Sequence, residues 1–260
     1  MPESASSPDL VTREVRDGVG IISLNRPEVH NAVTEPLRAQ LRQAFAWAAA
    51  ETEVRAVLVR GNGRSFCSGR DTSQFGVRPP GVTHLDAVGN AQAVRMEQIR
   101  ITKPTVAAVQ GATMGAGAEL AMAMDIRVAA DTLKFSLPEV NYGLVVDTGA
   151  SRMAVELAGL SRAKWLIMSG EAIGAGDALA WGLVDWVVGA GELEAKAFEV
   201  ARTLASKPPR AVAMAKRLIN DALEARLAPA MTQELLAQCV LFEGEEFKRL
   251  RDERKARRGK

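Results

Sequence analysis

The stretch from residue 104 to residue 147 constrains the fold more than any other part of the chain. It opens with PTVAAVQG, a short run of small and β-branched residues after a proline, which is typical of a buried strand. ATMGAGAELAMAMD then predicts a tight turn that runs into a helix, because its glycines free the backbone and AELAMAM contains strong helix formers. IRVAA predicts a second strand. This order of elements favours an α/β fold.

Three carboxylates accompany this unit. Glu119 stands at the start of the predicted helix, Glu139 follows the next short strand, and Asp147 comes eight residues later. Backbone N–H groups at a glycine-rich turn that opens a helix form a donor site for developing negative charge. Carboxylates beside such a site can transfer protons next to a polarised carbonyl. Because the sequence around Glu119 is apolar, we expect its side chain to be partly buried and its pKa to be raised.

The chain before this stretch is predicted to alternate strands and helices. LVTREVRDGVGIISLN predicts two strands joined at Asp17-Gly18, and Thr34 is an N-cap residue before an apolar stripe at helical spacing. VRAVLVRG predicts a buried strand that leads into the loop GNGRSFCSGRD. Residues 71–85 lack periodicity and predict a mobile loop, after which LDAVGNAQAVRMEQIRIT returns to helix.

The last third of the chain is predicted to be almost wholly helical. Two apolar stripes at helical spacing flank a restart at Pro208-Pro209, and a further long helix is expected from about Pro229. Apolar helix faces of this width need a packing partner. We therefore expect three parts: a disordered N-terminus over residues 1–8, an α/β core over residues 9–195 and a C-terminal helical region over residues 196–260.

Composition and residue counts exclude several classes of function. The net charge of the 260 residues is only +2, so the sequence gives no general attraction to nucleic acid or to a membrane. Two cysteines form no disulfide framework, and two histidines are too few and too scattered for a typical zinc site. No apolar run approaches the roughly 18 residues of a membrane span, and the N-terminus lacks a signal-peptide pattern. We expect a cytoplasmic protein without a metal.

Several motifs in the right order resemble the enoyl-CoA hydratase/isomerase (crotonase) superfamily. They are LNRPEVHNAV, SFCSGRD, GAGAELAM and SLPE, and the resemblance covers nearly the whole chain. It implies a spiral core of repeated strand-strand-helix units with a C-terminal helical region that builds a trimer, often stacked into a hexamer. It also implies an acyl-CoA thioester substrate, whose CoA is part of the substrate, and no metal or redox cofactor.

The resemblance implies roles for individual residues. The backbone N–H groups of Arg70 and Ala116 are expected to form an oxyanion hole for the thioester oxygen, although Arg70 stands where the family often has alanine. Glu119 and Glu139 match both catalytic glutamates of the hydratases, which orient a water across the α,β double bond and deliver the α-proton. Substrate and CoA contacts are expected at Glu28, Val29, Ala32, Ser68, Gly69, Asp71 and Gly115. The basic C-terminus is a further candidate for a CoA phosphate contact.

Asp147 leaves alternatives open. An aspartate at this distance from Glu139 resembles the dienoyl-CoA isomerases, which carry aspartate where this chain has Glu119, so the match is partial. The simpler interpretation of Asp147 is an N-cap of the helix in TGASRMAVELAG. We therefore rank an enoyl-CoA hydratase first and a double-bond isomerase using Glu139 and Asp147 second. A non-catalytic acyl-CoA-binding scaffold is third.

Other enzyme classes fit the sequence less well. A dinucleotide-binding turn fails because Leu120 occupies the place of the third glycine. A P-loop is excluded because no Gly-Lys-Ser/Thr follows the glycines. A serine hydrolase needs a histidine within reach, and neither His30 nor His84 stands in a recognisable context.

Overall fold

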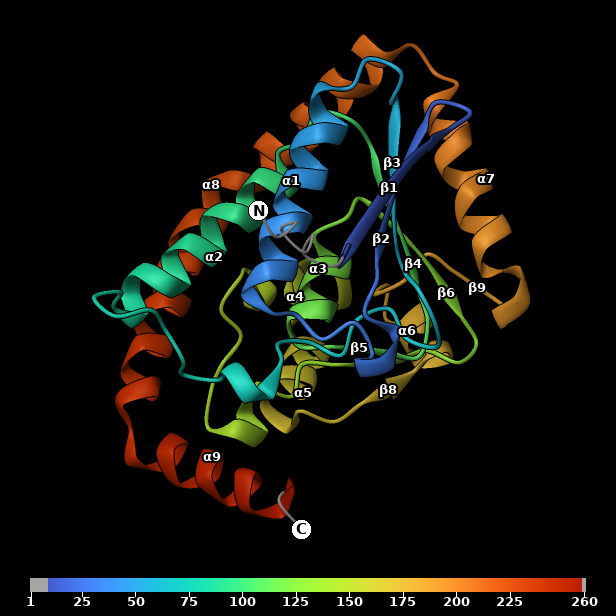
Figure 1. Cartoon of the computed structure of the whole chain (residues 1–260). Helices are drawn as coiled ribbons and strands as arrows, with labels where there is room; N and C mark the ends of the chain where they lie inside the picture. Colours follow the sequence, from blue (N-terminus) through green and yellow to red (C-terminus); the bar gives the residue numbers. More distant parts are fainter. Residues whose placement is uncertain (1–8, 259–260) are drawn as a thin grey trace, which may run out of the picture.

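The computed structural model describes residues 9–258, apart from the side chains of residues 222–227, 230, 233, 237, 246, 250 and 258. The segment 1–8, expected to be disordered, lies outside the described residues. The described strands form two sheets (Figure 1). The larger sheet has six strands in the order β1-β2-β3-β4-β6-β9, and the smaller has three in the order β5-β7-β8. The strands are β1 Val11–Arg16, β2 Val19–Leu24, β3 Ala56–Gly61, β4 Thr105–Val109, β5 Ala112–Met114, β6 Ile126–Ala130, β7 Lys134–Ser136, β8 Ile173–Gly174 and β9 Trp186–Val188.

The larger sheet contains the predicted strands. β1 and β2 pair antiparallel through a turn at Asp17-Gly18, whose φ values of 50° and 77° lie in the left-handed region that a tight hairpin turn needs. The other neighbours in this sheet pair parallel. Strands β2 and β4 are buried along their whole length, which explains their continuous apolar sequences.

The smaller sheet was only partly expected from the sequence. Strand β5 lies in the segment ATMG, which was predicted to be part of the turn; it pairs parallel with β7, and β7 pairs antiparallel with β8. Two strands precede a helix in β1-β2-α1 and in β4-β5-α3, as the predicted strand-strand-helix units require. The α/β class is therefore confirmed.

Helices cover the sheets on both sides. The α-helices are α1 Glu35–Ala50, α2 His84–Ile99, α3 Ala116–Met122, α4 Ala150–Ala158, α5 Leu160–Ser169, α6 Ala175–Ala180, α7 Leu193–Ala205, α8 Pro209–Glu243 and α9 Glu245–Arg258. Single helical turns occur at η1 Pro27–Val29, η2 Thr72–Gln74, η3 Glu139–Tyr142 and η4 Ala190–Glu192. Among the described residues, no helix is long and apolar enough to cross a membrane.

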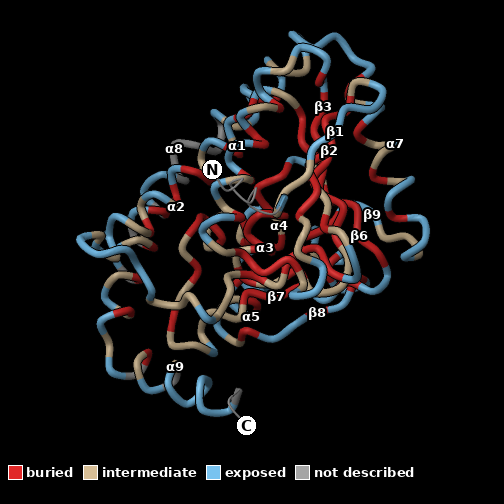
Figure 2. Tube along the Cα trace, in the orientation of Figure 1, coloured by how far each residue is buried: buried red, intermediate tan, exposed pale blue. Residues whose placement is uncertain are grey.

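The core is divided by the larger sheet (Figure 2). On one face, α7 packs against β2, β3, β4 and β6 and contributes four buried residues, Leu193, Ala197, Ala201 and Ala205. On the other face, α1 and α3 pack over the sheet, and the larger apolar cluster continues into α4, α5 and α6. Thr34 caps α1 as predicted, since its hydroxyl accepts a hydrogen bond from the Leu37 amide at 3.4 Å.

The C-terminal helices differ from the prediction in two respects. The boundary expected after residue 195 falls inside α7, which packs on the sheet. The restart expected near Pro229 is wrong, because α8 runs through Pro229 without interruption. An internal proline removes one backbone donor, and the contacts of α8 with α2 and α4 offset that loss. The loop expected over residues 71–85 contains η2 and ends at α2.

The close contact between two backbone segments sets the position of α3. A Cβ atom on Gly117 would lie 2.7 Å from the Cβ of Cys67 and would overlap the Cys67 carbonyl oxygen. Replacement of Gly117 by alanine should therefore lower the free energy of unfolding by about 3 kcal/mol, the upper end of the usual cost of overpacking, because backbone atoms cannot rotate away. Urea denaturation at neutral pH measures this loss.

Gly89 offers the matched control. It lies within α2, and no heavy atom stands within 4 Å of a Cβ built on it. Gly89→Ala should raise the stability by about 0.5–1 kcal/mol, since alanine is the better helix former. Equal effects of the two substitutions would contradict the packing that we describe.

Candidate active site

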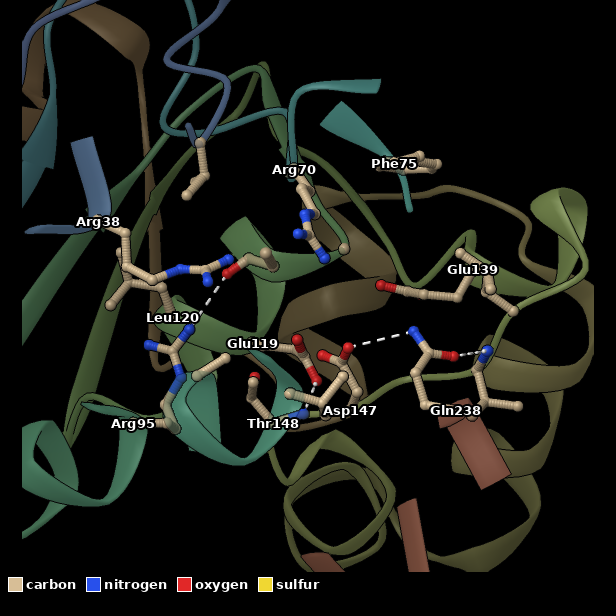
Figure 3. A pocket seen from close by; sticks show the side chains of 18 of the residues that line it. Arg38, Arg70, Phe75, Arg95, Glu119, Leu120, Glu139, Asp147, Thr148 and Gln238 are labelled. Atoms are coloured by element: carbon tan, nitrogen blue, oxygen red, sulfur yellow. Dashed lines mark hydrogen bonds between the residues drawn. The ribbon is translucent and has the colours of Figure 1, made fainter. Parts of the chain in front are cut away.

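A cavity of about 130 Å³ lies where α1, α2, α3, η3 and α8 meet. Most of the predicted site residues line it, and they come from segments that are far apart in the sequence (Figure 3). These lining residues are Ser68, Gly69, Arg70, Gly115, Ala116, Glu119, Glu139 and Asp147. The structure thus brings together both glycine-bearing turns and the three carboxylates.

The backbone around Arg70 is extended, which leaves the Arg70 amide free to face the cavity. The Val33 amide donates to the Gly69 carbonyl at 2.8 Å, and the Asp71 amide donates to the Val33 carbonyl at 2.9 Å. Because N–H groups alternate along an extended segment, the Arg70 amide points to the opposite side, away from Val33. Arg70 itself lines the cavity.

The second turn lies against the first. Ala116 is the first residue of α3, so its amide is one of the donors that have no acceptor within the helix. A Cβ atom on Gly69 would lie 2.8 Å from the Met114 carbonyl oxygen and 3.6 Å from the Ala116 amide nitrogen. The two segments are also joined by hydrogen bonds of 3.0 Å between Cys67 and the residues Ala112 and Met114. The two candidate amides therefore belong to backbone turns in direct contact.

Gly115 is required by the path of the second turn. Its φ of 50° and ψ of −123° are rarely adopted by other residues. A Cβ atom at this position would lie 2.9 Å from Oε1 of Glu139. Glycine therefore serves two purposes, the turn itself and the space beside the Glu139 carboxyl group.

Glu119 presents its carboxyl group to the cavity from α3 and is almost completely buried, at 1% exposure. The Thr148 amide donates to its Oε1 at 3.0 Å. Burial, together with the charge of Asp147, raises the pKa of Glu119 to about 7, and Arg95 opposes this rise. The expected burial and raised pKa are thus found, and Glu119 can both accept and release a proton near neutral pH.

Glu139 faces the cavity from η3, on the other side from α3 (Figure 3). Its Oε2 is buried and has no hydrogen-bond partner within the described part of the chain. Burial first, and the neighbouring Glu119 second, raise the pKa of Glu139 well above that of a free glutamate. This rise disfavours the ionised form of Glu139, which makes the group a candidate proton donor.

Asp147 lies beside Glu119 and is not a helix cap. The N-cap of α4 is Gly149, which has no side chain to accept a hydrogen bond, so the interpretation of Asp147 as its N-cap is wrong. Gln238 of α8 donates from Nε2 to Oδ2 of Asp147 at 3.1 Å. Burial raises the pKa of Asp147, while Arg70 and this hydrogen bond oppose the rise.

No local sequence pattern indicates that α8 contributes to the site. Glu234 accepts hydrogen bonds from the amides of Gly149 and Ser151, at 2.7 Å and 3.0 Å, and from the Ser151 hydroxyl. It therefore holds the start of α4 next to Thr148, the residue whose amide contacts Glu119. These contacts join residues more than 80 positions apart, which local sequence patterns do not reveal.

Four predicted contact residues do not line the cavity: Glu28, Val29, Ala32 and Asp71. Glu28 and Val29 lie in the exposed turn η1, and Asp71 caps η2 by accepting from the Ser73 amide at 3.1 Å. Asn31, which the sequence did not single out, is fully buried beside them. Its Nδ2 donates to the carbonyl oxygens of residues 62, 65 and 66, which ties this loop to the segment before Arg70.

The chemistry available in the cavity is proton transfer next to a polarised carbonyl. It holds two candidate amide donors, one carboxyl group with a pKa of about 7 and a second whose pKa is raised well above its usual value. Within the described residues, no cluster of histidine, cysteine, aspartate and glutamate is arranged to hold a metal ion.

Comparisons with known proteins show which family the chain is similar to. The family model described as enoyl-CoA hydratase/isomerase matches residues 14–256. A probable enoyl-CoA hydratase of Mycobacterium bovis is 33% identical over 226 residues, which is 86% of each protein. The 1,2-epoxyphenylacetyl-CoA isomerase of Escherichia coli is 32% identical over 219 residues, covering 82% of this chain and 83% of that protein.

The solved structures extend the likeness to three dimensions. The crystal structure of an enoyl-CoA hydratase from Mycobacterium avium subsp. paratuberculosis superposes with a TM-score of 0.86 at 32% sequence identity. The match covers 95% of this chain and 99% of that structure. The chain therefore belongs to the enoyl-CoA hydratase/isomerase family, with the crotonase fold.

Proposed function

We propose that this protein is an enzyme that adds water across the 2,3 double bond of an enoyl-CoA thioester. The observation that carries the proposal is the position of Glu119 and Glu139, which face one cavity from two elements beside the amides of Arg70 and Ala116. A scaffold that only binds acyl-CoA has no use for two buried carboxyl groups with raised pKa values, which cost free energy of folding.

In the proposed mechanism, the thioester oxygen accepts hydrogen bonds from the Arg70 and Ala116 amides. These donors stabilise the enolate, and each is worth about 2.7–4 kcal/mol in the transition state. Ionised Glu119 accepts a proton from water while the water oxygen bonds to C3. Protonated Glu139 then gives its proton to C2. Afterwards Glu119 releases a proton to solvent and Glu139 regains one, which restores the starting state.

Double-bond isomerisation is the second candidate, and the position of Asp147 favours it. Asp147 lies in the cavity rather than at a helix end, so that one carboxylate can remove a proton from one carbon while Glu139 delivers a proton to another. The isomerase of E. coli named above is a relative of comparable identity. Isomerisation leaves the mass of the thioester unchanged, whereas hydration adds one water.

We also propose the surroundings in which this chemistry takes place. CoA follows the loops that carry Glu28, Val29, Ala32 and Asp71, outside the reacting cavity, and no metal or redox cofactor takes part.

The protein assembles as a trimer or hexamer, because α8 exposes a set of large apolar side chains: Met214, Leu218, Ile219, Leu236 and Val240. Cys67 and Cys239 are free thiols, which fits a reducing cytoplasm.

Carboxyl-to-amide variants test the mechanism. Glu119→Gln and Glu139→Gln should each lower kcat for hydration by about 10²–10⁴, the usual contribution of a general acid or base. Asp147→Asn should have a smaller effect on hydration and a large one on isomerisation. The measurement is a panel of 2-enoyl-CoA and 3,5-dienoyl-CoA substrates with products identified by mass. Full activity in both glutamine variants would rule out both mechanisms.

The pH dependence of stability tests the environment of Glu119 independently of turnover. Its pKa rises from 4.5 to about 7 on folding, so the associated stability is present below pH 4.5 and is lost as the pH rises through 7. Glu119→Gln should therefore be more stable than the wild type at pH 8.5, by up to about 3 kcal/mol at 1.36 kcal/mol per pKa unit. The difference should shrink toward pH 5. Urea denaturation at both pH values measures it, and a difference that grows at acid pH would refute the assignment.

A further inference from the structure

Three arginines line the same cavity as the carboxylates. Arg38 comes from α1, Arg70 from the turn before η2 and Arg95 from α2. In Figure 3 the side chain of Arg70 points toward Glu119 and Asp147, and Arg38 lies near enough to Arg95 for its charge to affect the Arg95 guanidinium. The sequence motifs pointed only to the backbone of Arg70, and to neither Arg38 nor Arg95.

The arginines do not pair with the cavity's own carboxylates. Arg38 and Arg70 form ion pairs of 2.9 Å and 3.7 Å with Glu35, which lies outside the cavity lining. Arg95 donates to Oε1 of Gln98 at 2.6 Å and to the Ala116 carbonyl at 3.4 Å. In the described part of the chain, none of the three lies within ion-pair distance of a carboxyl group that lines the cavity.

Arg95 has donor capacity that the protein leaves unused. Only 8% of the residue is exposed, and its Nε is buried without a hydrogen-bond partner. Burial lowers the pKa of Arg95 to about 10; the charge of Glu119 opposes this shift, and the charge of Arg38 adds to it. A buried guanidinium with an unsatisfied N–H is costly, and an aliphatic acyl chain would compensate none of that cost.

The balance of charge in the cavity favours an anion. Three guanidinium groups line the cavity, whereas burial raises the pKa values of its carboxyl groups Glu119, Glu139 and Asp147 and so disfavours the ionised form of each. CoA phosphates are not the obvious partner, because they lie at the far end of the pantetheine arm from the thioester. The anion that reaches a site beside the reacting carbons is a group on the acyl chain itself.

We propose, on the basis of the hydratase function above, that the acyl chain of the substrate ends in a carboxylate that Arg38 and Arg95 bind. Guanidinium groups match carboxylate oxygens in planar, two-point hydrogen bonds, and burial makes such bonds strong and selective. The rest of this part of the cavity is lined by aliphatic side chains that fit a short methylene segment: Val33, Leu41, Val94 and Leu120.

Pairs of substrates of equal shape test the proposal. In 4-carboxybut-2-enoyl-CoA and 5-methylhex-2-enoyl-CoA, a carboxylate and an isopropyl group occupy the same position. In 5-carboxypent-2-enoyl-CoA and 6-methylhept-2-enoyl-CoA, the carboxylate and the isopropyl group again occupy the same position, one methylene farther from the double bond. We expect kcat/KM of the wild-type protein to be at least tenfold higher for the acid in one or both pairs, because a site built for a polar group rejects an analogue that lacks it.

Variants of Arg38 test whether this residue causes the preference for the carboxylate substrate. Arg38→Met should lower kcat/KM for the acid at least tenfold and should lower the acid-to-isopropyl ratio by the same factor. Arg38→Lys should restore part of that ratio. Arg42→Met is the matched control, because Arg42 also lies on α1 and pairs with a glutamate, Glu97, but does not line the cavity. It should leave the ratio as in the wild type.

Binding of saturated thioesters separates this inference from the proposed function. Calorimetry with 4-carboxybutanoyl-CoA and 5-methylhexanoyl-CoA requires no turnover and should show tighter binding of the acid, with the difference lost in Arg38→Met. Equal or tighter binding of the isopropyl compound would overturn the inference, even if both enoyl compounds are hydrated. Tight binding of the acid without hydration or isomerisation of any enoyl thioester would sustain the carboxylate site and reject the proposed function.

Discussion

The site depends on the contact between two backbone turns, one ending at Arg70 and the other at Ala116. Hydrogen bonds between Cys67 and the strand β5 bring these turns together, and glycine at 69 and 117 leaves room for them to touch. Backbone amides cannot change rotamer, so a donor site built from them stays in place whatever side chains surround it.

The electrostatics of the cavity follow from burial. Carboxyl groups that are removed from water and lie near one another resist ionisation, so the pKa values of Glu119 and Glu139 both rise. In the proposed mechanism one group accepts a proton and the other supplies one, although both are glutamates. The cost of holding them there is met by the rest of the fold, in particular by Thr148 and the start of α4 that Glu234 fixes.

Much of the fold could be predicted because its signals are local. The hairpin at Asp17-Gly18, the N-cap at Thr34 and the strands β4 and β6 each depend on a few neighbouring residues. The contribution of α8 could not be predicted, since Glu234 and Gln238 contact residues that are 83 to 93 positions away. A periodic pattern shows which face of a helix is apolar but not what that face meets. For the same reason Arg95 was missed, because only the folded chain places α2 against α3 and the cavity.

The separation between backbone and side-chain roles explains how one framework can serve different reactions. The turns at Arg70 and Ala116 would polarise any thioester carbonyl, because they contact only the part that all acyl-CoA substrates share. The reaction then depends on which carboxyl groups stand beside the reacting carbons, here Glu119, Glu139 and Asp147. The choice of acyl chain depends on the side chains farther along the cavity. If Arg38 and Arg95 bind the acyl chain as proposed, selection there can change while the backbone amide donors stay the same. The carboxyl groups are not independent of that selection, because the charge of Arg95 also opposes the rise in the pKa of Glu119.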